Sequence, residues 1–332
     1  MDGDARAYCC ADCGGVAGEG TSLKACKSCM IVKYCNANCQ RNHWLKHKKE
    51  CKQRAAELHD EALFKDPLPK DDCPICFLPM PTELICCWSL PAATIKSGVP
   101  IYKAVRANLD LAAKTTKNHY TCCGKTICEG CMYSFNESGN IGTCPFCKSE
   151  MADKTNDEHK KELMKRVEAN DANAICNLAN HYYFGNLGLQ QDQDRAIELW
   201  KQAAKFGSGK AHCYLGNEYS QMGDLKKAKL HYEPSAMAGN DQARYQCGYI
   251  ESELGNQARA LKHWKIVASA GEYNSMHFMI MHHKIGMVSK DTIDSTLEAY
   301  NNSCAEMRSE ARDSSLNMFI DSLEEQNNCP VS

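Results

Sequence analysis

The placement of cysteine constrains this chain more than any other feature of its sequence. The chain has 23 Cys among 332 residues, and all but five of them lie between Cys9 and Cys147. A cluster of this density indicates either a disulfide framework or metal sites. Disulfides persist in oxidising compartments, which secreted chains reach through an apolar leader. Residues 1–6 are largely polar and charged, so we expect a non-secreted, cytoplasmic or nuclear protein that binds zinc.

Charge and apolar content exclude several classes of protein. Lys plus Arg number 39 and Asp plus Glu 41, which gives a formal net charge of −2. That balance argues against a globally basic nucleic-acid binder and against a polyacidic disordered chain. No run approaches the ~18 consecutive apolar residues that a membrane-spanning helix needs, so we expect no membrane partner.

Composition also divides the chain into segments. Pro67 and Pro69 stand among charged residues and cannot continue a helix, so they indicate a linker. The stretch 148–166 is strongly charged and lacks Gly and Pro, which leaves open an exposed helix or a solvated linker. We predict a multidomain chain with two small zinc-stabilised modules followed by an all-α helical-repeat solenoid. The segments are a zinc finger at 9–51, a linker at 52–72, a second zinc module at 73–147, the charged stretch at 148–166, helical repeats at 167–285, and a C-terminal helical cap and tail at 286–332.

The C-terminal half repeats itself with a period of about 32 residues, in the range that stacked helical repeats use. Gly207, Gly239 and Gly271 are equally spaced at this period. Such self-similarity predicts stacked helical hairpins instead of one globular core. Small residues let paired helices approach, aromatic residues fill the space between layers, and each Gly closes a helix. The same spacing relates the aromatic residues Trp200, Tyr232 and Trp264 and the small residues Ala196, Ala228 and Ala260.

The repeat units resemble Sel-one-like repeats of the tetratricopeptide superfamily, most closely in the segment Asp194-Arg195-Ala196-Ile197-Glu198-Leu199-Trp200. The resemblance covers 167–285 and implies peptide or protein partners. Pro234 departs from the pattern, and we expect it to kink or shorten its helix. Residues 290–326 have amphipathic spacing and are expected to cap the last apolar face of the solenoid.

The first Cys-rich segment contains eight zinc-type ligands, spaced C-x2-C-x12-C-x2-C-x5-C-x3-C-x7-H-x3-C. Zinc takes four such ligands in a tetrahedron, so eight fill two closed sites. Ligands four residues apart can project from one face of a helix. The eight are Cys10, Cys13, Cys26, Cys29, Cys35, Cys39, His47 and Cys51.

This segment resembles a MYND-type zinc finger, in Lys33-Tyr34-Cys35 and in His43-Trp44-Leu45-Lys46-His47-Lys48-Lys49-Glu50-Cys51. The resemblance implies binding of short peptides without chemistry, with Cys9 and His43 outside the ligand set. It also implies interleaved sites, with Cys10, Cys13, Cys35 and Cys39 on one zinc and Cys26, Cys29, His47 and Cys51 on the other. The basic residues of the segment suggest nucleic-acid contact, but no aromatic residues interleave with them, so we favour a solvated helix face. They are Arg41, Lys46, Lys48, Lys49, Lys52 and Arg54.

The second Cys cluster resembles a RING finger with two C-P-x-C pairs and a C-C-x-K-x-I-C-x-x-C centre. Lys125 stands where many RING fingers have His, so either Cys122 or His119 must complete the site with Cys123. A long insert follows Cys76; we expect a helix at 101–116 and free thiols at two insert positions, Cys86 and Cys87. The resemblance implies interleaved zinc ligands, which we assign as Cys73, Cys76, Cys128 and Cys131 on one ion and Cys122, Cys123, Cys144 and Cys147 on the other. The two modules together predict about four zinc ions per chain.

RING fingers of ubiquitin ligases recruit a ubiquitin-conjugating enzyme and position its thioester, and they supply no nucleophile. Three family contact positions are matched here by Ile75, Pro145 and Lys148. We therefore expect a RING-type ubiquitin ligase that binds the conjugating enzyme through this module and substrates through the repeats and the MYND-like finger. One alternative is a non-catalytic protein–protein interaction scaffold. A second alternative is a transcriptional or nucleic-acid-associated adaptor. A metalloenzyme is disfavoured, because the sixteen ligands close all four tetrahedra.

Overall fold

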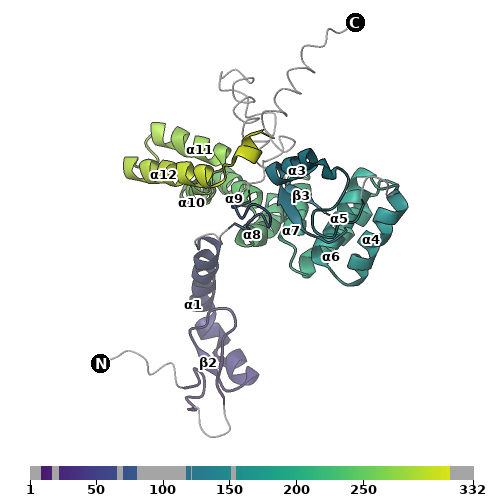
Figure 1. The fold of residues 1–332 in the computed structure, drawn as a ribbon. Helices are drawn as coiled ribbons and strands as arrows, with labels where there is room; N and C mark the ends of the chain where they lie inside the picture. The colour runs from purple at the N-terminus through teal and green to yellow at the C-terminus, as the bar shows by residue number, and fades with distance from the viewer. Residues whose placement is uncertain are drawn as a thin grey trace. The chain divides into compact units, whose positions relative to one another are not determined.

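The computed structural model describes residues 9–16, 22–65, 70–80, 117–120, 122–150 and 155–314 (Figure 1). The chain splits into two compact units, Met1–Lys65 and Asp66–Ser332. The predicted insert helix at 101–116, Cys86 and Cys87 lie outside the described residues. Within the described ranges, no helix is both long and apolar enough to cross a membrane.

The first unit consists of a small hairpin followed by one long helix. Strand β1 (Lys24–Ala25) pairs antiparallel with β2 (Lys33–Tyr34). Helix α1 (Ala37–Leu63) begins where the side chain of Asn36 accepts a hydrogen bond of 3.0 Å from the backbone N–H of Cys39. Most of the predicted linker 52–72 therefore belongs to this helix, because no Gly or Pro interrupts the chain before Pro67. The buried side chains of α1 are Cys39, His47, Cys51 and Leu63.

The second unit opens with the second zinc module, whose described residues 70–80, 117–120 and 122–150 form two short strands, a short helix and a π-helical turn. Strand β3 (Lys117–His119) pairs antiparallel with β4 (Thr126–Cys128), and helix α3 (Glu129–Phe135) leads into a π-helical turn, η4 (Asn136–Asn140). Thiol groups supply most of its interior, so ordinary hydrophobic packing contributes little to its stability. The buried core residues are Cys73, Met80, Tyr120, Ile127, Cys128, Cys131 and Cys144.

Helical hairpins follow, as the repeat period predicts. Gly207, Gly239 and Gly271 each have a φ between 86° and 89°, the left-handed conformation that ends a helix. Polar side chains begin the helices: Asp171, for example, accepts hydrogen bonds of 2.9 and 3.1 Å from Asn173 and Ala174. The helices are α4 (Asn156–Glu168), α5 (Ala172–Phe184), α6 (Gln193–Lys205), α7 (Gly209–Gln221), α8 (Leu225–Met237), α9 (Asp241–Glu253), α10 (Gln257–Ser269), α11 (Tyr273–Lys284) and α12 (Lys290–Glu306).

The repeated aromatic residues form the layers of the solenoid core. Trp200, Tyr232 and Trp264 are all fully buried. Two glycines, separated from each other by the same period, make room for Tyr232 and Trp264. A Cβ on Gly216 would lie 2.6 Å from the Tyr232 ring, and one on Gly248 would lie 2.5 Å from Nε1 of Trp264. These two hairpins therefore pair a missing side chain with a large one, whereas Phe184 occupies the corresponding position before Trp200.

The helix that contains Pro234 and the charged stretch 148–166 can now be compared with what the sequence predicted. Of the two effects expected of Pro234, a kink or a shorter helix, shortening does not occur, because α8 has 13 residues, as do α7 and α9. The carbonyl that loses its donor belongs to Leu230, whose side chain is 65% exposed, so water can solvate this face of the helix. The charged stretch 148–166 contains most of a true helix, α4, which begins with a capping box between Thr155 and Glu158.

The C-terminal part of the repeats is closed by α12. Val288 and Ile293 are buried in the same cluster as Trp264, and the partly buried Tyr300 packs against that cluster. This helix thus covers the last apolar face of the solenoid, as expected for a capping element.

Candidate zinc sites and the surfaces around them

The structure brings the sixteen predicted ligands together in four groups of four. Within each group, the ligand atoms lie within 4.8 Å of one another. The combinations are those that the two interleaved patterns imply, and Cys122 accompanies Cys123. The groups are Cys10, Cys13, Cys35, Cys39; Cys26, Cys29, His47, Cys51; Cys73, Cys76, Cys128, Cys131; and Cys122, Cys123, Cys144, Cys147.

The sulfur–sulfur distances fit tetrahedral zinc. A Zn–S bond of about 2.3 Å gives a tetrahedron edge of about 3.8 Å, whereas a disulfide bond is about 2.05 Å long. The Sγ atoms of Cys73 and Cys131 are 3.7 Å apart, and those of Cys123 and Cys144 are also 3.7 Å apart. In the finger, Sγ of Cys29 lies 3.2 Å from Nε2 of His47. No disulfide joins the cysteines that the structure describes. The donor set therefore fits four zinc ions.

One type of local turn orients the thiols of four C-x2-C pairs. In the pairs that begin at Cys10, Cys26, Cys73 and Cys144, the residue four positions later donates its backbone N–H to the carbonyl of the first Cys, at 2.8–3.0 Å. Every such donor has a positive φ, between 55° and 72°. The turn folds the backbone around the ion so that both thiols of a C-x2-C pair point inward. The four donors are Gly14, Met30, Phe77 and Lys148.

Crowded thiols cannot all ionise unless a cation is present. Burial, and then hydrogen bonding to Cys26, raises the pKa of Cys51 to about 12. By contrast, the hydrogen bond with Ser149, 3.1 Å away, lowers the pKa of Cys147 to about 6. Burial and hydrogen bonding among neighbouring thiols therefore oppose full ionisation of such a group, and a bound Zn²⁺ would supply the positive charge that lets four donors coexist.

Lys125 does not take a ligand role in the second module. Its Nζ lies over the Phe146 ring, 4.8 Å from the centroid. A cation–π contact of this kind accounts for a lysine next to a thiol cluster without deprotonation. The side chain of His119 is outside the described residues.

The three predicted contact positions of the second module lie at or near its surface. Ile75 is 40% exposed, Pro145 is half-buried and Lys148 is exposed, with its Nζ 5.3 Å from the centroid of the Phe135 ring. Phe77, which the sequence analysis did not single out, is 77% exposed. An aromatic residue directly after a C-x2-C pair is the sequence signal that could have identified it.

The basic residues of α1 are mostly solvent-exposed. Arg54 pairs with Glu57 at 3.1 Å and with Glu61 at 2.8 Å, which neutralises the end of the run. Leu45 and Trp44 are apolar and exposed on the same helix. His43 lies outside the ligand groups, as expected, and its Nδ1 is 3.1 Å from the hydroxyl of Tyr34.

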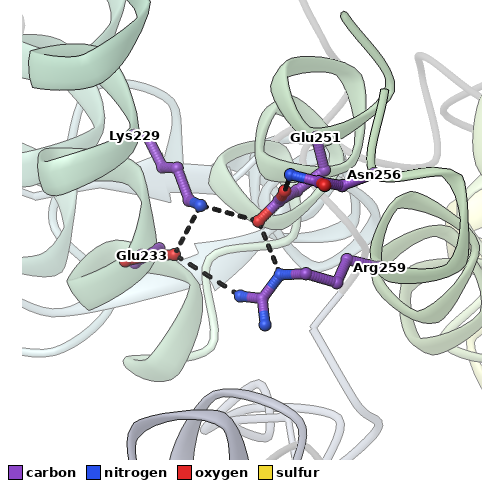
Figure 2. Close-up of polar contacts among 5 residues, drawn as sticks. All are labelled: Lys229, Glu233, Glu251, Asn256 and Arg259. Carbon is purple, nitrogen blue, oxygen red and sulfur yellow. Dashed lines mark hydrogen bonds and ion pairs between the residues drawn. The ribbon is translucent and has the colours of Figure 1, made fainter. Parts of the chain in front are cut away.

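A buried network of charges in the helical repeats was not anticipated. Glu251 of α9 has no exposed surface. Lys229 of α8 and Arg259 of α10 each lie 2.8 Å from the same oxygen of its carboxylate (Figure 2). Asn256 donates to the other oxygen at 2.8 Å. Although burial by itself raises the pKa of Glu251, these hydrogen bonds lower it to about 2. The network connects three successive helices. Neither Glu251 nor Lys229 recurs at the 32-residue period, so the repeat pattern does not reveal the network.

Comparison with known proteins identifies the first module. The family model of the MYND finger matches residues 7–51, so this segment is a MYND-type zinc finger. A Sel1 repeat protein from Oxalobacter formigenes is 25% identical, with 37% of this chain and 97% of that chain covered and a TM-score of 0.34. The antigen c5321 of uropathogenic Escherichia coli strains, which displays an SLR fold, is 16% identical, with 65% and 47% covered and a TM-score of 0.36. Because these TM-scores are low, the assignment of helical repeats rests on the helices of this chain itself.

Proposed function

We propose that the chain is a RING-type ubiquitin ligase of the cytosol or nucleus and that the four groups of ligands hold structural zinc. The second module recruits a ubiquitin-conjugating enzyme, and the helical repeats and MYND finger hold the substrate. The observation that carries this proposal is the interleaving of two four-thiol groups along residues 73–147. Ile75 stands in the turn of one group, and Pro145 stands in the turn of the other.

The surface of the second module supports a docking role. Ile75 and Phe77 are exposed apolar side chains close together in the chain, and exposed apolar patches mark interaction sites. Lys148 follows the last thiol and is accessible to an acidic partner. Exposed apolar side chains beside a basic residue are the combination with which RING fingers hold a charged conjugating enzyme.

The module contributes position and no covalent chemistry. Each group consists of four donors, so a bound zinc ion has a closed shell and no open position for a substrate or water. The rate gain comes from holding the thioester of the conjugating enzyme in conformations open to attack by a substrate lysine.

Ubiquitin transfer by the purified, zinc-loaded chain tests the proposal. With a broad panel of conjugating enzymes, we expect ubiquitin chains to form with at least one of them. Ile75→Ala should lower the rate at least tenfold and leave the zinc content unchanged. Ile141→Ala is the matched control, because Ile141 is an exposed isoleucine of the same module. Absence of transfer with every enzyme, from a folded chain with all its zinc, would overturn the ligase proposal.

A non-catalytic scaffold is the second candidate. It is favoured by the MYND finger, whose Trp44 and Leu45 are exposed on α1, and by the helical repeats. Both elements mediate protein–protein interactions. The scaffold predicts stable complexes with protein partners and no ubiquitin transfer, so the same assay separates the two functions.

A further inference from the structure

The end of the helical repeats contacts the second zinc module through a buried arginine. Arg312 follows α12, in a helical stretch at 310–314, and is 2% exposed. Its Nη1 donates to the carbonyl of Pro79 at 3.0 Å and to the carbonyl of Met307 at 2.6 Å, and its Nη2 lies 3.6 Å from Sγ of Cys76. The guanidinium thus joins the repeats to the backbone and to a thiol of the module.

Burial of a guanidinium is costly unless a negative charge compensates it. Among the described residues, the hydrogen-bond partners of the Arg312 side chain are two carbonyls and the thiols of Cys76 and Cys128, and none is a carboxylate. Four thiolates around Zn²⁺ carry a formal charge of −2, so the group that includes Cys76 supplies the missing anion when zinc is bound. Arg312 and the metal site therefore each satisfy a charge that the other leaves buried.

Gly130 provides an independent observation of the same contact. It lies in α3, between the ligands Cys128 and Cys131. A Cβ at this position would lie 2.6 Å from the backbone N of Arg312 and 2.6 Å from its Cγ. Glycine in a helix costs about 1 kcal/mol relative to alanine, and here it is the residue that permits the segment carrying Arg312 to approach the thiols.

We propose that Arg312 is a positioning residue for the zinc site formed by Cys73, Cys76, Cys128 and Cys131. Its hydrogen bond orients the Cys76 thiolate, and its charge balances the site, so the end of the helical repeats slows zinc loss from the second module. The inference rests on the proposed zinc site and does not depend on ligase activity.

The first experiment measures zinc release from the full chain in the presence of a chelator, with a colorimetric zinc indicator. Loss of a residue that orients a metal ligand typically costs 10–100-fold in metal affinity. We expect Arg312→Gln to release one of the zinc ions 10–100-fold faster and to leave the others unchanged. Arg308→Gln is the matched control, because Arg308 lies four residues away, is largely exposed and pairs with Asp313 at 3.2 Å. It should change no rate by more than about twofold, as expected for an exposed pair.

Alkylation followed by mass spectrometry identifies which ion leaves. In Arg312→Gln, Cys76 and Cys128 should become reactive early, whereas Cys123 and Cys144 should remain protected. Equal acceleration at both sites would show general unfolding of the module and overturn the proposal. Unchanged rates at both sites would also overturn it. If the chain binds no zinc in the second module at all, the zinc assignment itself fails, whatever the ubiquitin assay shows.

Two further variants keep the test decisive if Arg312→Gln does not fold. Gly130→Ala displaces the segment carrying Arg312 while favouring α3, so faster zinc loss would support the proposal and unchanged or slower loss would refute it. Arg312→Lys retains the charge and should restore part of the slow release. In the cobalt-substituted chain, loss of the hydrogen bond should move the thiolate-to-cobalt charge-transfer band of one site to longer wavelength. A purely structural role for Arg312 leaves that band in place.

Discussion

Glu251 offers a sharp test of how the helical repeats are held together. The substitution Glu251→Gln keeps the size of the side chain and removes its charge from between Lys229 and Arg259. The pKa of Glu251 is lowered from 4.5 to about 2 in the folded chain. At 1.36 kcal/mol per unit, this shift corresponds to an upper limit of about 3 kcal/mol of stabilisation.

The geometry around Glu251 is consistent with a loss of stability close to that upper limit. After the substitution, Glu233 remains near the two cations, at 3.7 Å from Lys229 and 3.9 Å from Arg259. Removing one partner of a buried ion pair costs about 3–5 kcal/mol, and glutamine recovers part of this through its carbonyl oxygen. We therefore expect Glu251→Gln to lower the free energy of unfolding of the repeats by about 2–3 kcal/mol.

The direction of the pH dependence follows from the lowered pKa. Stabilisation by a carboxylate with a depressed folded-state pKa is complete above 4.5 and disappears as the pH falls toward 2. The difference in the free energy of unfolding between the original chain and Glu251→Gln should therefore be constant from pH 7 to pH 5 and should shrink below pH 4.5. Because both proteins lose zinc in acid, the difference between them isolates the effect of Glu251.

Urea unfolding followed by helical circular dichroism, together with hydrogen exchange in α8, α9 and α10, measures the effect. Glu253→Gln is the control, since Glu253 lies on the same helix and is exposed. Exposed substitutions change stability by less than about 0.5 kcal/mol. If Glu251→Gln behaves like this control, the network does not stabilise the repeats and the reasoning fails.

Two further predictions concern metal content and packing. Elemental analysis of the purified chain should find about four zinc ions. Cys123→Ser should lower the zinc content by one ion, because a tetrahedral site rarely retains zinc with three thiolates. An unchanged zinc content would show that Cys123 is not a ligand. Gly248→Ala should lower the thermal unfolding midpoint of the repeats, measured by calorimetry. The new Cβ would lie 2.5 Å from Nε1 of Trp264, and overpacking costs about 1–3 kcal/mol. A higher midpoint would contradict this packing argument.

Local spacing was sufficient for the C-x2-C pairs and for the helical hairpins, whereas the assignment of those pairs to four interleaved groups is what the two family resemblances implied. A C-x2-C pair folds over a few residues, so its thiols converge whatever the rest of the chain does, and the eight ligands of the finger follow one another within residues 10–51. Likewise, the period of the repeats reproduces the same local packing of a large aromatic against a Gly, as in Tyr232 with Gly216. These features depend on neighbours in the sequence, and that is why they could be predicted.

Other features depend on residues far apart in the chain. Pro234 was expected to kink or shorten α8, but α8 packs against both α7 and α9 and keeps its full length. The charge network needs three helices to meet at Glu251, and Arg312 reaches Cys76 from the opposite end of the second unit. Such contacts have no period or motif, because burial and close approach are properties of the folded chain. The sequence by itself determined which residues could bind zinc and repeat as helices, whereas the tertiary structure alone decided which buried charges compensate one another.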